Sequence, residues 1–179
     1  MDHFESIIST LLEAEGYWVR RSFKVNVTKD EKRLIGKHSI PRPEIDLLAL
    51  NFSKNEVLAF EAKSYLDSPG VNLKQLKEEH QVPQGRYKLF TSEHYRTVVL
   101  SRLLSDLIAC DMANSKTKII LGLAAGKVYQ CRSEPIREFM LSKNWLFWSP
   151  EDIKQKVTAL AERGYENDPA IITAKILMR

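Results

Sequence analysis

Cysteine is scarce in this 179-residue sequence, which has only Cys110 and Cys131, without metal-binding spacing. Two cysteines in apolar surroundings argue against a disulfide framework or a zinc site and predict reduced thiols in the core. Long hydrophobic runs are also missing, because no stretch approaches the roughly 20 apolar residues of a membrane span. No basic and then apolar leader opens the chain. We therefore expect a cytoplasmic protein that makes no membrane contact.

Repeats, low-complexity tracts, a P-loop and a dinucleotide-binding fingerprint are absent from the sequence as well. What is present is ordinary for a soluble globular protein, with an apolar fraction of 44% and a charged fraction of 28%. The length suits one domain, residues 1–179, with enough chain to bury a core.

Positive charge is concentrated in one part of the chain. The whole chain has a net charge of +4, whereas residues 20–42 have eight basic residues against Asp30 and Glu31, a net charge of +6. The basic residues of this basic segment are Arg20, Arg21, Lys24, Lys29, Lys32, Arg33, Lys37 and Arg42. Such a block suits a polyanion whose backbone approaches the carboxylates that follow. A solvated, lysine-rich loop explains the charge about equally well.

Residues 43–63 have the pattern of a β-hairpin. Two short apolar runs, 45–52 and 57–62, flank a polar break at 53–55. Glu61 and Lys63 then point to the same face of the second strand. With a two-residue turn at 53–54, Asp46 lies directly across from Glu61, with Cβ atoms about 5 Å apart.

Two carboxylates at that distance repel each other unless a cation lies between them. Lys63 alone is a poor counterion for both, whereas Mg²⁺ or Mn²⁺ is held by one or two carboxylates, waters and phosphate oxygens. The pattern therefore predicts a divalent metal site. The alternative is a surface aspartate on an edge strand, next to an ordinary exposed Glu/Lys pair.

The stretch Pro-Glu-Ile-Asp at 43–46, followed by Glu-Ala-Lys at 61–63, resembles the PD-(D/E)xK motif of restriction-endonuclease-like and Holliday-junction-resolvase-like nucleases. One extra residue separates this stretch from the family pattern. Asp46 is in register on its strand and matches the family's aspartate better than Glu44 does. The resemblance covers residues 1–80, and residues 81–179 complete the core.

The resemblance implies a role for each of these residues. Asp46, Glu61 and the Ala62 carbonyl would hold one or two Mg²⁺ or Mn²⁺ ions, and Lys63 would orient the water or stabilise the transition state. Glu5, on the first helix, would reach the metal through water. An equally good explanation for Glu5 is a capping box with Asp2 at the start of that helix.

The nucleic-acid contacts are expected on two elements. Arg20, Arg21 and Lys24 belong to an amphipathic strand at 17–27, whose apolar face consists of Val19, Phe23, Val25 and Val27. Gln75 lies on a short polar helix that begins near residue 71, where the resemblance implies a contact with the substrate backbone. Ordinary surface composition explains Gln75 better.

The remaining pattern predicts helices and strands in alternation. Helices are expected at 2–15, 94–112, 135–141, 149–163 and 167–177. A mobile loop or ragged hairpin is expected at 28–42, a loop at 80–92, a second hairpin at 118–131, and a short strand or buried apolar plug at 145–148. This order predicts an α/β domain with a mixed central sheet flanked by helices, in agreement with the restriction-endonuclease-like fold. The last two helices either cover the core or form an oligomer surface. In the second case we expect a homodimer.

The predicted function is metal-dependent hydrolysis of a nucleic-acid phosphodiester, with DNA implied by the resemblance and Mg²⁺ or Mn²⁺ as cofactor. A rival hypothesis is a DNA-binding module that has this fold but no catalysis, favoured by the shifted motif. A third hypothesis, a basic scaffold protein with an accidental motif, explains less.

Overall fold

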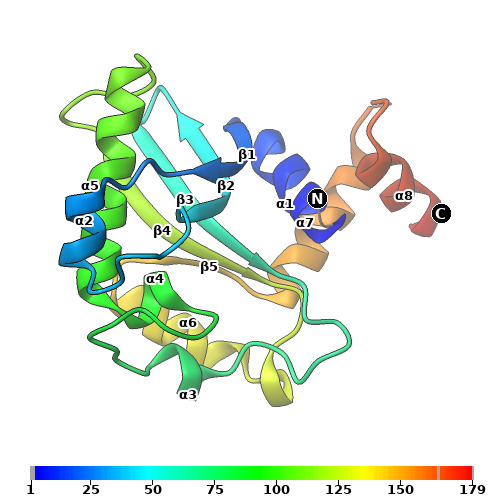
Figure 1. Ribbon diagram of the computed structural model, residues 1–179. Coiled ribbons are helices and arrows are strands. Elements are labelled where there is room, and N and C mark those ends of the chain that lie inside the picture. Colours follow the sequence, from blue (N-terminus) through cyan, green and yellow to red (C-terminus); the bar gives the residue numbers. More distant parts are fainter. Residues whose placement is uncertain (1–2, 165, 179) are drawn as a thin grey trace.

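Five strands form one mixed sheet, in the order β1-β2-β3-β4-β5, in the computed structural model, which describes residues 3–164 and 166–178 (Figure 1). The strands are β1 (Trp18–Lys24), β2 (Glu44–Asn51), β3 (Glu56–Lys63), β4 (Lys118–Ala125) and β5 (Leu146–Trp148). The helices are α1 (His3–Ala14), α2 (Lys29–Leu34), α3 (Leu73–Leu76), α4 (Lys88–Thr91), α5 (Glu93–Ala109), α6 (Ser133–Ser142), α7 (Pro150–Glu162) and α8 (Pro169–Leu177). The chain is therefore a single α/β domain, as predicted.

The sheet changes from antiparallel to parallel at β3. Strands β1, β2 and β3 are antiparallel neighbours, whereas β4 runs parallel to β3 and β5 parallel to β4. Parallel neighbours need a crossover connection; the chain between β3 and β4 includes α5, and that between β4 and β5 includes α6. The predicted hairpin at 118–131 is wrong, because residues after β4 form a short 3-10 helix, η1 (Tyr129–Cys131), instead of a strand.

Helices cover both faces of the sheet (Figure 1). On one face, Leu103 and Leu107 of α5 and Met140 of α6 pack in a core with the inward residues of the strands. On the other face, Leu12 of α1 and Leu160 of α7 belong to a second core. Each of these four helices thus contributes buried apolar residues to a core shared with the sheet, which is what makes the layered arrangement stable.

Strand β1 changes face in its middle, which the sequence did not indicate. Val19 packs on the core of α1, whereas Phe23 and Val25 belong to the core of α5. The predicted single apolar face from Val19 to Val27 is therefore wrong. Ser22 between them has φ +51°, in the left-handed region, and this backbone turn interrupts the alternation of side chains along the strand.

Three other expectations about local structure are wrong. Residues 29–34 of the first expected loop form α2, whose start is capped by Thr28 and Glu31 in a capping box. Residues 88–91 of the loop expected at 80–92 form α4. Cys110 and Cys131 are exposed rather than buried, because Cys110 follows the end of α5 and Cys131 is the last residue of η1, both at the surface. The predicted Asp2–Glu5 capping box involves Asp2, which lies outside the described residues.

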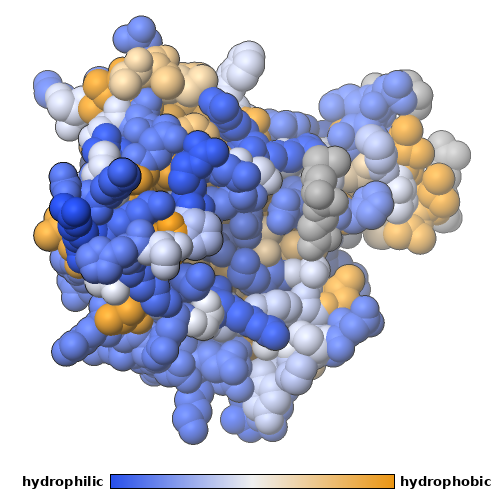
Figure 2. Space-filling model, in the orientation of Figure 1, coloured by the Kyte–Doolittle hydropathy of each residue, from blue (hydrophilic) through white to orange (hydrophobic). Residues whose placement is uncertain are grey.

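The C-terminal helix α8 lies beyond α7, on the side away from the sheet (Figure 1). Figure 2 shows hydrophobic atoms at its surface, where Ile176, Leu177 and Met178 are exposed. A homodimer that uses this surface stays a prediction. In the described parts of the chain, no helix combines the length and the apolar character needed to cross a membrane.

Candidate active site

The candidate site begins where β2 and β3 separate. Their paired residues end at Leu47 opposite Phe60, and the same register continued by one residue brings Asp46 opposite Glu61. The connecting turn has four residues, 52–55, instead of two. It is centred on the predicted position, so the predicted register of the paired residues is confirmed.

Asp46 and Glu61 share one positive partner. Asp46 Oδ2 accepts a hydrogen bond from the Ala62 N–H at 2.9 Å, and Lys63 Nζ donates to the same oxygen at 3.3 Å. Lys63 Nζ also lies 2.9 Å from Glu61 Oε2. The expectation that Lys63 is a poor counterion for both carboxylates is therefore wrong, because its long side chain reaches from one strand to the other.

All three side chains are largely buried, with exposed fractions of 19% for Asp46, 14% for Glu61 and 20% for Lys63. Both strands lie inside the sheet, since β1 and β4 flank them. The alternative of a surface aspartate on an edge strand, beside an exposed ion pair, is excluded by this placement. A buried cluster of three charges needs a reason other than solubility.

Burial dominates the electrostatics of Glu61. It raises the pKa of the Glu61 carboxyl; the charge of Lys63 opposes this shift, and the negative charges of Asp46 and Glu5 add to it. Burial acts to lower the pKa of Lys63, but the Glu61 and Asp46 carboxylates outweigh it and raise that pKa. Lys63 is therefore protonated at neutral pH, while the ionised form of Glu61 is held in an unfavourable environment.

A pocket of about 470 Å³, the carboxylate pocket, opens onto the cluster. Besides the motif residues, Tyr95 of α5, Lys88 of α4 and Arg86 of the preceding loop line it. Burial and the charge of Glu61 raise the pKa of Tyr95 to about 12, so its hydroxyl is a hydrogen-bond donor at neutral pH. These residues were not predicted from the sequence. Arg86 and Lys88 lie in a basic, tyrosine-containing run at 86–88, which could have indicated them, whereas Tyr95 had no such local signal.

The donor set suits a hard divalent ion. Asp46 Oδ2 and Glu61 Oε2 both contact Lys63 Nζ, at 3.3 and 2.9 Å, so the two carboxylates face the same position, where a shared cation would lie. The Ala62 carbonyl lies on the same side of β3 as its N–H, toward Asp46. Among residues 3–164 and 166–178, no three His, Cys, Asp or Glu side chains are grouped to hold a metal. Waters and phosphate oxygens would complete the shell, as is usual for Mg²⁺.

Glu5 and Glu44 lie at the margin of the site. The charge of Glu5 acts on Glu61, which places α1 within electrostatic reach of the cluster. Glu44 lines the carboxylate pocket and forms a cross-strand ion pair with Lys24 at 3.9 Å. Asp46, which accepts the Ala62 N–H, is thus the acidic residue of β2 that lies opposite Glu61, as the register predicted, whereas Glu44 is paired with Lys24.

The four residues predicted to contact nucleic acid lie in different surroundings. Arg21 donates to Ser6 Oγ of α1 at 3.2 Å, and Arg20 lies 5.1 Å from the centre of the Phe23 ring. Lys24 lies beside the carboxylate pocket through its Glu44 partner. Gln75 is exposed on α3 and lines a second hollow next to that pocket. The structure therefore brings Lys24 and Gln75 near the site and directs Arg21 toward α1.

Comparison with known proteins finds no relative: no family model matches the chain, and neither the curated proteins nor the solved structures contain a match. A functional conclusion therefore depends on the geometry and chemistry of the site.

Proposed function

We propose that this protein is a metal-dependent nuclease that hydrolyses nucleic-acid phosphodiester bonds, with a restriction-endonuclease-like fold. The observation that carries the proposal is the convergence of Asp46, Glu61 and Lys63 in one pocket at the point where β2 and β3 separate. The fold assignment is supported by the order of elements: α1, an antiparallel β1–β3 unit, α5, and a parallel β4.

Each residue of the pocket has a distinct task in this proposal. Asp46, Glu61 and the Ala62 carbonyl would hold Mg²⁺ or Mn²⁺. When bound, such an ion supplies an activated water and neutralises charge at the scissile phosphate. Lys63 contributes a fixed positive charge for the oxygens of the transition state, in a site with little solvent.

Residues outside the motif would position the substrate. Arg86 and Lys88 line the carboxylate pocket and carry charges that suit phosphate oxygens. The Tyr95 hydroxyl, held protonated beside Glu61, donates a hydrogen bond to a phosphate oxygen or to the attacking water. These residues supply orientation, which lowers the barrier by holding the phosphate and the attacking water in a reactive geometry.

A second candidate function is a nucleic-acid-binding module without catalysis. It is favoured by one observation, the contact of Lys63 with both carboxylates, which neutralises part of the cluster without any metal. In that case the carboxylates and Lys63 are a structural ion cluster and the basic residues around them bind the backbone.

The decisive experiment measures cleavage of plasmid, branched and single-stranded DNA with Mg²⁺ or Mn²⁺, and again with EDTA. We expect metal-dependent cleavage that Glu61→Gln and Lys63→Ala each abolish. Glu56→Gln, at the other end of the same strand, is the matched control and keeps full activity. Mn²⁺ binding, followed by electron paramagnetic resonance, should weaken in Glu61→Gln and persist in Lys63→Ala.

Two results separate the candidates. Wild-type protein that binds DNA but cuts none of the three substrates favours the non-catalytic module. Protein that neither binds nor cuts nucleic acid contradicts both candidate functions.

A further inference from the structure

We propose that a hollow next to the carboxylate pocket binds an unpaired nucleobase of the strand whose phosphate enters that pocket. This inference rests on the proposed nuclease function and names its substrate class, single-stranded or locally unpaired nucleic acid. The hollow, called the tyrosine hollow below, has a volume of about 560 Å³. The lining residues that matter here are Tyr65, Gln75, His80, Arg86 and Tyr129.

The tyrosine hollow and the carboxylate pocket share a wall. Tyr65, Gly85 and Arg86 line both cavities. In a nucleic-acid strand each base is attached to the backbone beside a phosphate, so a phosphate at Asp46 and Glu61 brings a neighbouring base to this wall. Arg86 on the wall provides a cation with several donors for the linking phosphate.

Flat surfaces for stacking are present at the wall and at the rim. The guanidinium carbon of Arg86 lies 5.6 Å from the centre of the Tyr65 ring. Tyr129 is 41% exposed, so much of its side chain is open to a ligand. Aromatic rings and guanidinium planes are the surfaces on which proteins hold unstacked bases, largely independently of sequence.

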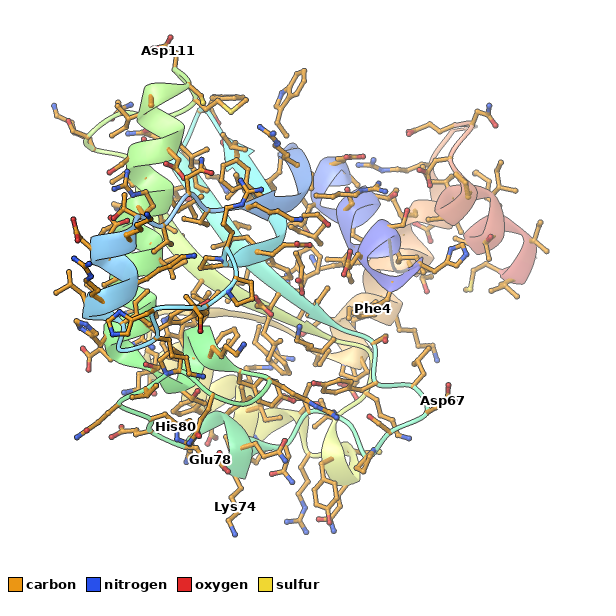
Figure 3. All side chains as sticks on the ribbon, in the orientation of Figure 1. Phe4, Asp67, Lys74, Glu78, His80 and Asp111 are labelled. Carbon is orange, nitrogen blue, oxygen red and sulfur yellow. The ribbon has the colours of Figure 1, made fainter. Side chains whose placement is uncertain are left out.

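Polar groups line another part of the tyrosine hollow. His80 lies 3.2 Å from Glu78 Oε2 and 2.9 Å from Gln84 Nε2, contacts that orient its ring. Figure 3 shows His80 and Glu78 side by side near α3, with Lys74 pointing away from them. The exposed Gln75 amide adds both a donor and an acceptor. An unpaired base exposes the donors and acceptors of its Watson–Crick edge, which the Gln75 amide matches.

Backbone hydrogen bonds join the two loops that carry Tyr65 and Tyr129. The Val71 N–H donates to the Lys127 carbonyl at 2.9 Å, and the Tyr129 N–H donates to the Val71 carbonyl at 2.9 Å. Gly70 lies so close that a Cβ at its position would come within 2.9 Å of the Lys127 oxygen. The tyrosine hollow is thus held in shape before a ligand binds, which lowers the entropic cost of binding.

Binding in EDTA tests this inference without relying on cleavage. The probes are single-stranded DNA and RNA with one 2-aminopurine, and a matched DNA duplex. We expect wild-type protein to bind the single strands more tightly than the duplex, with a change in 2-aminopurine fluorescence. Tyr129→Ala should weaken single-strand binding by roughly 5- to 100-fold, the range for one lost base–aromatic stack.

Two control variants show whether the Tyr129 ring is what matters. Tyr129→Phe keeps the ring and should retain wild-type affinity. Phe52→Ala removes another ring that is 62% exposed, in the turn at the far end of β2 and β3, and should change nothing. If RNA but not DNA responds to Tyr129→Ala, or the reverse, the base belongs to that polymer.

The outcomes distinguish this inference from the proposed function. Metal-dependent cleavage together with unchanged single-strand binding in Tyr129→Ala overturns the tyrosine hollow alone. Equal losses for single strands and duplex also overturn it, since they assign Tyr129 to general backbone contact. Absence of any nucleic-acid binding by the wild-type protein overturns both.

Discussion

Two clusters of acidic and basic side chains in this molecule have opposite electrostatics. At the start of α7, Asp152 Oδ2 accepts from the Ser149 N–H at 2.8 Å and from Arg137 at 2.9 Å. Burial acts to raise the pKa of Asp152, but these hydrogen bonds outweigh it and lower that pKa. In the carboxylate pocket, burial prevails and the pKa of Glu61 is raised.

The difference teaches how to separate structural charges from functional ones. At α7, several donors converge on one carboxylate, so its ionised form stabilises the fold. In the pocket, two carboxylates share the single ammonium of Lys63. Burial nevertheless raises the pKa of Glu61, and perturbed acids of this kind in a cavity are typical of sites that bind or react with a ligand.

The largest expected effect is on activity, and it should fall on one cluster alone. Lys63→Ala should lower the cleavage rate by at least about 100-fold, the typical effect of removing a group that stabilises transition-state charge. Arg137→Ala, which removes the cation of the α7 cluster, should leave the rate within about twofold of wild type. Single-turnover cleavage assays on folded variants make the comparison. Equal losses in both variants would show that the pocket has no special role.

For the free energy of unfolding, we expect the reverse: substitutions in the α7 cluster should have larger effects than substitutions in the carboxylate pocket. Asp152→Ala removes the N3 side chain of a capping box and the partner of Arg137, so it should cost about 1–2 kcal/mol of unfolding free energy. Glu61→Gln relieves repulsion with Asp46 and should leave stability unchanged or raise it. Urea unfolding followed by circular dichroism measures both. A larger loss in Glu61→Gln than in Asp152→Ala would mean that the pocket cluster is structural.

The pH dependence of stability sharpens the same contrast. Because the pKa of Glu61 is raised in the folded state, its ionisation makes wild type lose stability relative to Glu61→Gln as pH rises above about 4.5. Because the pKa of Asp152 is lowered, wild type should lose its advantage over Asp152→Asn as pH falls below about 3.8. Urea midpoints from pH 3 to pH 8 give both difference curves. Parallel curves for the two variants would contradict the opposite shifts.

The smallest effects are expected at the exposed Lys24–Glu44 pair, which joins a lysine of the basic segment to a residue that lines the carboxylate pocket. Lys24→Ala should change the unfolding free energy by no more than about 0.5 kcal/mol, because both side chains are solvated. If Lys24 contacts a phosphate, the variant should lower the salt slope of DNA binding by roughly 0.9. Fluorescence anisotropy at several salt concentrations measures the slope, and an unchanged slope assigns Lys24 to the solvated surface.

The central hairpin and its charged residues could be predicted from the sequence. Alternation within each strand and a polar break between them determine which side chains share a face, and these are properties of neighbouring residues. The same holds for α7, for which the sequence predicts a helix from residue 149 and whose start is fixed by a capping box between Ser149 and Asp152. Patterns of this kind specify structure over a few residues, whatever the rest of the chain does.

Only the tertiary structure decided the partners of these local elements. The sequence of β4 reads equally well as a hairpin strand, and its parallel pairing with β3 depends on a crossover through α5. That crossover brings Tyr95 to the carboxylate pocket, and the loop before it brings Arg86 to the wall shared with the tyrosine hollow. Contacts between segments so far apart depend on how helices pack on the sheet, which periodicity within one segment does not encode.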